Sequence, residues 1–364
     1  MPQRIDSLDQ FRGYTVLGMF VVNFLGHFRA TPVLLKHNDT FCSYADTIMP
    51  AFFFAVGFAF RLTYLRRAAI GETSIWRRFG QRNARLLLFG ALIYVLPAAV
   101  EGMTQSRPPT LVKFISFALQ EELFQTLVHI GVTALWILPV IGRRATIRLG
   151  WACGSAGLHL LLSRWFYYEH VNRIGIDGGP LGFLSWTLPM IAGSLAHDIV
   201  AETTGGNRPV QRLLFWGGVV MLLGYGLACL NLSTPPNTPA PGRLGAWLVE
   251  PPFVPPTRPV NLWTMSQRAG SVSYQMFGAG LSLALYAVFV WACDGRKLQL
   301  GIWRTLGTNA LAAYVIHIAV GWAFAPLLPR GTSLSGAIAM LIPFLAVCYL
   351  CVWMLEKKKI YWRM

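Results

Sequence analysis

The sequence predicts an all-α, polytopic membrane helical bundle with about ten transmembrane helices and both termini in the cytoplasm. Composition is the first indication, since 54% of the residues are hydrophobic and 13% are charged, which is typical of a lipid-embedded chain. Apolar runs long enough to cross the hydrocarbon core recur along the whole chain. Lys and Arg residues are also concentrated in alternate connecting segments.

Ten apolar runs are expected to form the spanning helices. Their approximate ranges are 14–28, 44–65, 80–99, 123–141, 147–166, 181–198, 213–231, 271–293, 306–325 and 335–355. No small-residue cleavage site follows the first run, so we interpret it as a signal anchor. We expect residues 1–364 to form a single integral-membrane domain, with a long Pro-rich external loop at 232–270 that cannot be regular helix.

The distribution of basic residues predicts the orientation. With the N-terminus in the cytoplasm, the inner loops contain twenty of the 31 Lys and Arg residues, and the outer loops contain ten. This asymmetry follows the positive-inside rule. The formal net charge of +16 therefore indicates membrane topology, and no nucleic-acid partner is expected.

Two polar groups in the first quarter of the chain are candidates for catalysis. Asp46 lies at the head of the second apolar run, where an ionised carboxylate is expensive and usually functional. His37 lies nine residues upstream, in the connecting loop. A neutral imidazole can accept a proton from an amine or hydroxyl, and a carboxylate can hold its tautomer. The pattern predicts a general base beside a carboxylate at the outer membrane surface.

Further polar residues lie inside apolar runs, namely Asn23 in the first run and Asn309 and His317 in the run 306–325. Because Asn309 and His317 are eight residues apart, a continuous helix would place them within about a quarter turn of one another, so that both can face one cavity. Each alone also fits a packing role across a helix interface. The sequence has no HExxH, Cys/His metal spacing, GxSxG elbow or phosphate-binding glycine motif, so no metal site is predicted.

Several blocks in order along nearly the whole chain carry a family resemblance. They are Ser7-Leu8-Asp9-Gln10-Phe11-Arg12-Gly13, Lys36-His37, Ala45-Asp46-Thr47-Ile48-Met49-Pro50, Asn261-Leu262-Trp263-Thr264, Gly307-Thr308-Asn309 and Lys358-Lys359-Ile360-Tyr361-Trp362. In this order the chain resembles the heparan-alpha-glucosaminide N-acetyltransferase-like transmembrane acyltransferases, a family with bacterial members. The resemblance implies a multi-pass protein of a bacterial inner membrane.

The resemblance also implies an activity: transfer of an acetyl group from cytosolic acetyl-CoA to an amino sugar on the far side of the membrane. His37 would correspond to the family's essential loop histidine. The residues lining the site would be Asn23, Asp46, Asn309 and His317. The CoA phosphates would meet inner-loop arginines, for which the candidates are Arg77, Arg78, Arg82 and Arg85.

Two departures leave the substrates open. The fourth apolar run has Leu127-Val128-His129-Ile130-Gly131 where the family usually has Leu-Gln-Arg-x-Gly, and Pro259-Val260 replaces a usual lysine before Asn261. The leading hypothesis is an acetyl-CoA-dependent N- or O-acetyltransferase acting on an extracytoplasmic sugar or glycan. A transporter or flippase for a glycan or small metabolite is the alternative, although no internal repeat is present. Acyl-chain preference, a covalent acetyl-histidine and assembly into a homo-oligomer stay open.

Overall fold

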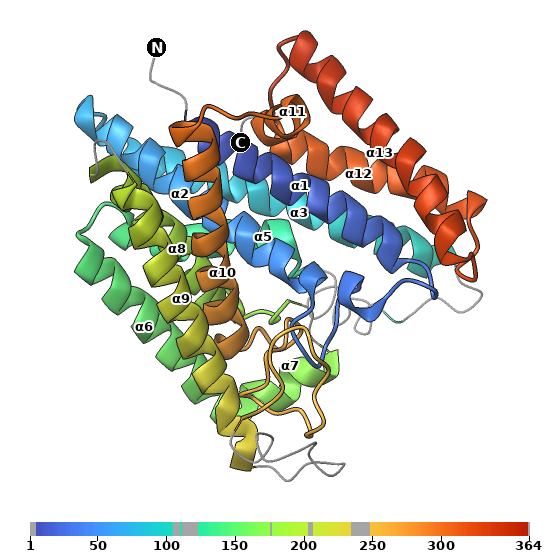
Figure 1. Ribbon diagram of the computed structural model, residues 1–364, viewed down its shortest axis with the longest axis horizontal. Helices are drawn as coiled ribbons and strands as arrows, with labels where there is room; N and C mark the ends of the chain where they lie inside the picture. Colours follow the sequence, from blue (N-terminus) through green and yellow to red (C-terminus); the bar gives the residue numbers. More distant parts are fainter. Residues whose placement is uncertain are drawn as a thin grey trace.

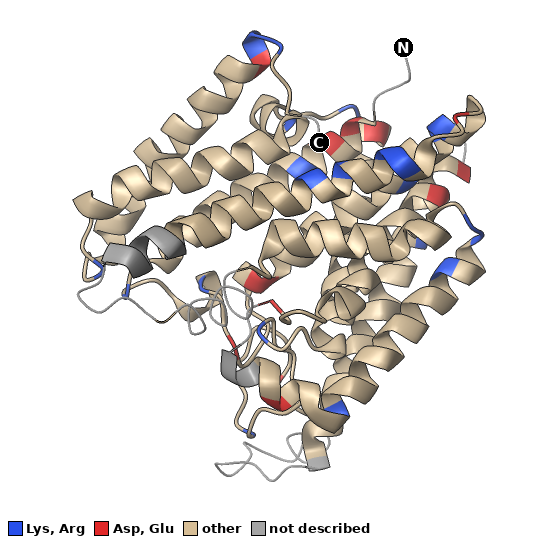
Figure 2. Cartoon of the chain, turned by 180° about the vertical axis from the view of Figure 1, so that it is seen from behind, with Lys and Arg blue, Asp and Glu red and all other residues tan. Residues whose placement is uncertain are grey.

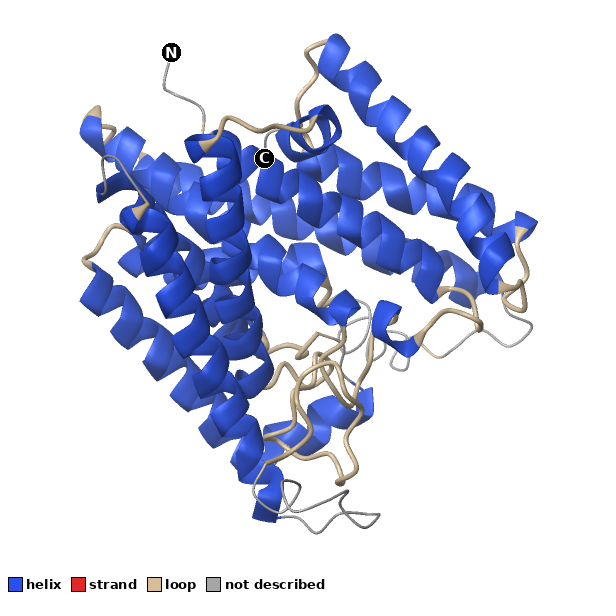
Figure 3. Ribbon diagram, in the orientation of Figure 1, coloured by secondary structure: helices blue, strands red, loops and turns tan. Residues whose placement is uncertain are grey.

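The computed structural model describes residues 5–104, 110, 123–174, 177–202, 207–233 and 248–362. Within these ranges the chain folds into helices joined by loops, without any strand (Figure 3). The longer helices are α1 (Asp6–Gly26), α2 (Tyr44–Ala69), α3 (Ile75–Thr104), α5 (Thr126–Ile141), α6 (Ala145–Leu162), α8 (Phe183–Glu202), α9 (Arg208–Ala228), α10 (Val272–Phe289), α12 (Ala310–Phe324) and α13 (Leu334–Lys357). Each predicted apolar run coincides with one of them. Two short helices are α7 (Tyr168–Ile174) and α11 (Gly301–Thr308).

Length and apolarity identify membrane-crossing helices among the described residues. Five segments qualify, namely Tyr44–Ala69, Arg208–Leu232, Val272–Gly295, Ala310–Leu327 and Leu334–Lys357. They confirm an all-α membrane helical bundle. The prediction of ten spans goes beyond these five and stays a prediction.

The helices form two groups that meet at α2 and α5 (Figure 1). In this view α6, α8, α9 and α10 lie on one side, and α1, α3, α12 and α13 lie on the other. Helix α2 packs directly against α8, because a side chain at Gly57 would collide with the carbonyl oxygen of Met190 and one at Gly193 with that of Phe54. These glycines let the two backbones touch, which fixes α2 and therefore the position of its first turn.

The block Ser7–Gly13 holds α1 in place. The Ser7 hydroxyl donates to Oδ2 of Asp294 at 2.6 Å. A side chain at Gly13 would collide with the carbonyl of Trp303 in α11. The block is therefore a docking interface for α1 against the segment that follows α10.

The described ends of the chain lie at the same end of the bundle. Asn309 separates α11 from α12, and its amide hydrogen-bonds the backbone of Ile360 and Trp362, close to where α1 begins. Lys and Arg residues concentrate toward this end (Figure 2). This arrangement agrees with termini on one side of the membrane; which side that is stays a prediction.

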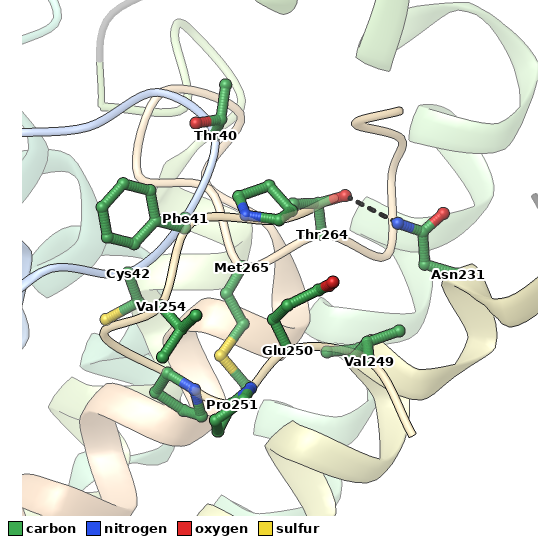
Figure 4. Close-up of a pocket in the computed structure, with 13 residues that line it drawn as sticks. Thr40, Phe41, Cys42, Asn231, Val249, Glu250, Pro251, Val254, Thr264 and Met265 are labelled. Carbon is green, nitrogen blue, oxygen red and sulfur yellow. Dashed lines mark hydrogen bonds between the residues drawn. The ribbon is translucent and has the colours of Figure 1, made fainter. Parts of the chain in front are cut away.

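The second half of the Pro-rich loop covers the opposite end. Residues 234–247 of the predicted loop lie outside the described residues, and 248–271 are irregular, as the prolines predict. The segment folds onto the His37 loop, since Phe253 N donates to Cys42 O at 2.9 Å and the Ser266 hydroxyl donates to Asp39 O at 2.6 Å. A pocket of about 30 Å³ remains under it, lined by Cys42 and residues 249–252 among others (Figure 4). Its volume suits about one water molecule.

Candidate active site

The first turn of α2 fixes the Asp46 carboxylate. The Ser43 hydroxyl accepts a hydrogen bond from Asp46 N at 3.3 Å, and Oδ2 of Asp46 accepts one from Ser43 N at 2.9 Å, which forms a capping box. Asp46 is fully buried, and the positive end of the helix dipole stabilises its negative charge. The box uses Oδ2, and Asn38 N lies 3.4 Å from both oxygens, so Oδ1 can still accept from a closer donor.

That donor is His37. Its Nδ1 lies 3.0 Å from Oδ1 of Asp46 and 3.2 Å from Oε1 of Gln267. Both partners are acceptors, so Nδ1 carries a proton and donates to both. The predicted pairing of His37 with Asp46 is confirmed as a contact. Gln267 is a member of the cluster that the sequence did not predict.

Two turns that pack against each other position Gln267. Its Nε2 donates to Oδ1 of Asp177 at 2.7 Å. Asp177 has a left-handed backbone (φ 52°), and its carbonyl accepts from Nε1 of Trp186 at 2.7 Å. A Cβ at Gly270 would lie 2.8 Å from the Cα of Gly178, so these two glycines allow the turns to touch. A non-glycine residue held in the left-handed region often marks a functional site.

The other ring nitrogen of His37 faces α1. Nε2 lies 3.4 Å from Oδ1 of Asn23, and Nδ2 of Asn23 lies 3.1 Å from Nε2 of His317. Nδ1 of His317 donates to the carbonyl of Tyr314, so Nε2 of a neutral His317 is an acceptor. Asn23 must therefore present its amino group to His317 and its oxygen to His37. A carbonyl oxygen opposite Nε2 is satisfied when that nitrogen also carries a proton, so the arrangement suits the imidazolium form of His37.

The electrostatics around His37 agree with this geometry. Desolvation lowers the pKa of His37, but the hydrogen bond and negative charge of Asp46, with a contribution from the Asp177 charge, raise it above its usual 6.5. Burial raises the pKa of Asp177 to about 6, although the bond from Gln267 works in the opposite direction. The His37 side chain keeps 48% of its surface exposed. The ring is thus held by its Nδ1 edge and accessible elsewhere.

A cavity of about 290 Å³ begins beside the cluster, between α1, α12 and α13. Asn23 and His317 contribute polar groups to its lining. The rest is mainly apolar or aromatic and includes Phe24, Phe28, Trp322, Phe324 and Phe344. Asn23 therefore connects His37 to a chamber large enough for part of a substrate.

The structure does not bring Asn309 to this cluster, which corrects the expectation that Asn309 and His317 face one cavity. The run 306–325 is interrupted at Asn309, whose backbone (φ −130°, ψ 43°) lies between α11 and α12. Nδ2 of Asn309 donates to Ile360 O at 3.0 Å, and its Oδ1 accepts from Trp362 N at 3.1 Å. Asn309 fastens the end of the chain to the bundle.

The predicted donor-binding arginines lie at the start of α3, which follows directly on the end of α2 remote from Asp46. Arg77 and Arg78 are exposed, and Arg78 approaches Glu72 at 3.5 Å. Arg82 is partly buried one turn further along. His129, at the departure from the family pattern, is fully buried on α5 beside Trp186.

A buried ionic cluster lies at the same end as these arginines and was not predicted. Arg61 of α2 donates from Nε and Nη2 to the two carboxylate oxygens of Asp198 at 3.0 and 3.2 Å. Arg148 of α6 also pairs with Asp198 and is fully buried. The cluster ties α2, α6 and α8 together. Because Asp46 lies in the first turn of α2, the cluster also helps to fix the helix that positions Asp46.

Residues 4–183, about half of the chain, match the family model described as heparan-alpha-glucosaminide N-acetyltransferase, catalytic. The matched segment contains Asn23, His37, Asp46 and Asp177, whereas Gln267 and His317 lie beyond it. The chain matches no curated protein. The match and the membrane helices indicate a transmembrane acyltransferase. Through residues 4–183, the chain belongs to the heparan-alpha-glucosaminide N-acetyltransferase catalytic family.

Proposed function

We propose that the protein transfers an acetyl group from cytosolic acetyl-CoA to an amine or hydroxyl of a sugar or glycan on the other side of a bacterial inner membrane. One observation carries the proposal within the family match. His37 is held at Nδ1 by the buried Asp46 and exposes its ring beside a cavity, at the end of the bundle remote from the basic end. This is the arrangement that a general base requires.

The two ring nitrogens of His37 have different roles in the proposed reaction. An incoming acceptor amine takes the place of the Asn23 oxygen at Nε2, once His37 is neutral. The amine nitrogen attacks the thioester carbonyl carbon while Nε2 takes its proton, and the C–S bond breaks. CoA leaves as a thiolate and receives the proton from the imidazolium. Asp46 stabilises the imidazolium between the two proton transfers.

The same contacts also suit a covalent route. A neutral His37 whose Nδ1–H is bound to Asp46 has its lone pair on Nε2, so it can attack the thioester to form an acetyl-histidine. The acceptor then attacks that intermediate and His37 is regenerated. Chemical trapping of acetylated His37 in the absence of acceptor distinguishes the two routes.

The donor is expected to bind from the basic end. Arg77 and Arg78 are exposed there and supply positive charge for the phosphates of CoA. The acetyl thioester must then extend through the bundle toward His37. The separation of the basic end from His37 supports transfer across the membrane in place of transfer on one face.

The test is transfer of labelled acetyl from acetyl-CoA to glucosamine in proteoliposomes, with the two substrates on opposite sides. His37→Ala is expected to lower the rate by about 10²–10⁴, the usual contribution of a general base. His170→Ala, on α7 and outside the cluster, is the matched control and should retain the wild-type rate. Movement of the sugar across the membrane without acetylation would reject the proposal in favour of a transporter or flippase.

A further inference from the structure

The cavity beside Asn23 points to the class of acceptor. We propose that this cavity holds the hydrocarbon tail of a lipid-linked acceptor, whose sugar head carries the reactive amine or hydroxyl to His37. The inference rests on the proposed function and narrows it from sugars in general to membrane-anchored ones.

The position of the cavity is the first argument. It lies between α1, α12 and α13. Only 17% of the apolar window of α12 and of α13 is buried within the protein, compared with 61% for α2 and for α10. Trp322, which lines the cavity, is 59% exposed. The outer surface of these helices therefore faces lipid, and a tail can enter from the bilayer.

The lining of the cavity is the second argument. The polar lining residues are Asn23, whose amide is exposed, His317 and His27, and the other walls are aromatic or aliphatic. The amide of Asn23 bonds to His317 and to His37, and it places a polar group at the edge of an otherwise mainly apolar surface. An amphiphile matches both parts, since its tail covers the apolar walls and its polar head reaches Asn23 and then His37.

The volume of the cavity and its position at the His37 end of the bundle favour an acceptor tail over a donor acyl chain. A volume of about 290 Å³ equals the space of roughly ten water molecules, far more than an acetyl group needs. The lining residues His27, Phe28 and Leu328 follow the last turns of α1 and α12, on the His37 side. The donor phosphates would bind at the opposite, basic end.

Gly321 gives a direct test, because it lines the cavity and a Cβ there meets no atom within 4 Å. Gly321→Phe fills the cavity without displacing backbone. Gly218→Phe on α9 is the matched control, since that glycine is equally unobstructed, similarly half-buried and absent from the cavity lining. Acetyl transfer is measured with glucosamine and with a dodecyl glucosaminide as acceptors.

Gly321→Phe is expected to lower kcat/KM for the dodecyl glucosaminide by about tenfold or more, equivalent to about 1.4 kcal/mol of lost contact. Transfer to glucosamine should stay at the wild-type rate, and Gly218→Phe should leave both acceptors unaffected. Equal rates for both acceptors in Gly321→Phe and wild type would overturn the proposal. A defect of Gly321→Phe that appears only when the donor is a long-chain acyl-CoA would also overturn the proposal, because it would assign the cavity to the donor.

A second measurement does not depend on acetyl transfer. A dodecyl glucosaminide with a photoreactive group in its tail is irradiated with the protein in the absence of acetyl-CoA. Crosslinks are expected on α12, to be lost in Gly321→Phe and kept in Gly218→Phe. Crosslinks spread equally over α9 and α12 would overturn the assignment. If α12 is labelled selectively while no variant or wild type transfers acetyl, the proposed reaction fails and the tail site stands.

Discussion

Oδ1 of Asn23 lies 3.4 Å from Nε2 of His37, at the position where a base must receive the proton of its substrate. The amide cannot simply rotate away, because Nδ2 of the same side chain is bound to His317 at 3.1 Å. In the free protein this contact favours a protonated His37, and in the proposed reaction an acceptor would displace the Asn23 oxygen from Nε2. In the proposed reaction His317 would act through Asn23, as a positioning residue.

The first prediction concerns Asn23→Ala. Removing the oxygen that faces Nε2 takes away a hydrogen bond to the charged form of His37, so the pKa of His37 should fall. The acid limb of the pH profile of kcat/KM should move to lower pH, because a larger fraction of His37 is neutral at each acid pH. An acid limb at the wild-type position would show that Asn23 has only a packing role.

The second prediction concerns Asp46→Asn. The single amide oxygen can still accept from Nδ1 of His37, but the amino group then faces Ser43 N, so that half of the capping box is lost together with the negative charge. Desolvation lowers the pKa of His37, and without the Asp46 charge less remains to raise it, so this pKa should fall. The imidazolium formed during transfer should be less stable for the same reason. The rate at the optimal pH should fall by about ten- to a hundredfold, as expected for one charge-assisted hydrogen bond of about 1.5–3 kcal/mol. Wild-type rates throughout the profile would contradict this role.

The third prediction concerns the stability effect of Asp177. Its pKa is about 6 in the folded protein against 3.8 for the unperturbed group, so burial of this carboxyl costs stability that grows as the pH rises from about 4 to about 6 and is complete above that. Asn tolerates the left-handed backbone at this position. Asp177→Asn should therefore melt at a higher temperature than wild type at pH 7.5. Below about pH 4 both side chains are neutral, and the difference in melting temperature in detergent should disappear.

The fourth prediction concerns the ionic cluster at the other end of the bundle. Asp198→Asn leaves the buried Arg61 and Arg148 without their counter-charge and should cost about 3–5 kcal/mol. Glu202→Gln, which changes an exposed ion pair one turn away, should alter stability by no more than about 0.5 kcal/mol. Thermal unfolding of the purified variants provides the comparison. Equal melting temperatures would mean that the cluster adds nothing to the frame.

The fifth prediction concerns donor binding. Charge reversal of Arg77 and Arg78 should weaken acetyl-CoA binding, and added salt should weaken wild-type binding in the same direction, because exposed charges are screened. Arg164→Glu, an exposed charge reversal near α7, is the control and should leave binding unchanged. Titration calorimetry at two ionic strengths measures both effects. Binding that ignores the double reversal would place the phosphates elsewhere.

The sequence by itself determined the helices and one half of the site. Apolar runs identify helices because backbone hydrogen bonds in lipid must be satisfied within the segment, which is a local requirement. The pairing of His37 with Asp46 was also predictable, since the two residues are nine positions apart and the capping Ser43 lies between them. The block Ser7–Gly13 was also recognisable as part of the family resemblance. Its role in packing α1 against the segment that follows α10 was not predicted.

Only the tertiary structure decided the rest of the cluster. Gln267 lies 230 residues from His37 and 90 from Asp177, and His317 lies 294 from Asn23. The expectation for Asn309 failed because it assumed a continuous helix, whereas the chain breaks there to receive its own C-terminal segment. Contacts of this kind depend on which turns and helix faces pack together. Helical periodicity carries information about neighbours three or four residues away, and the partners in this cluster are set by the packing of whole helices.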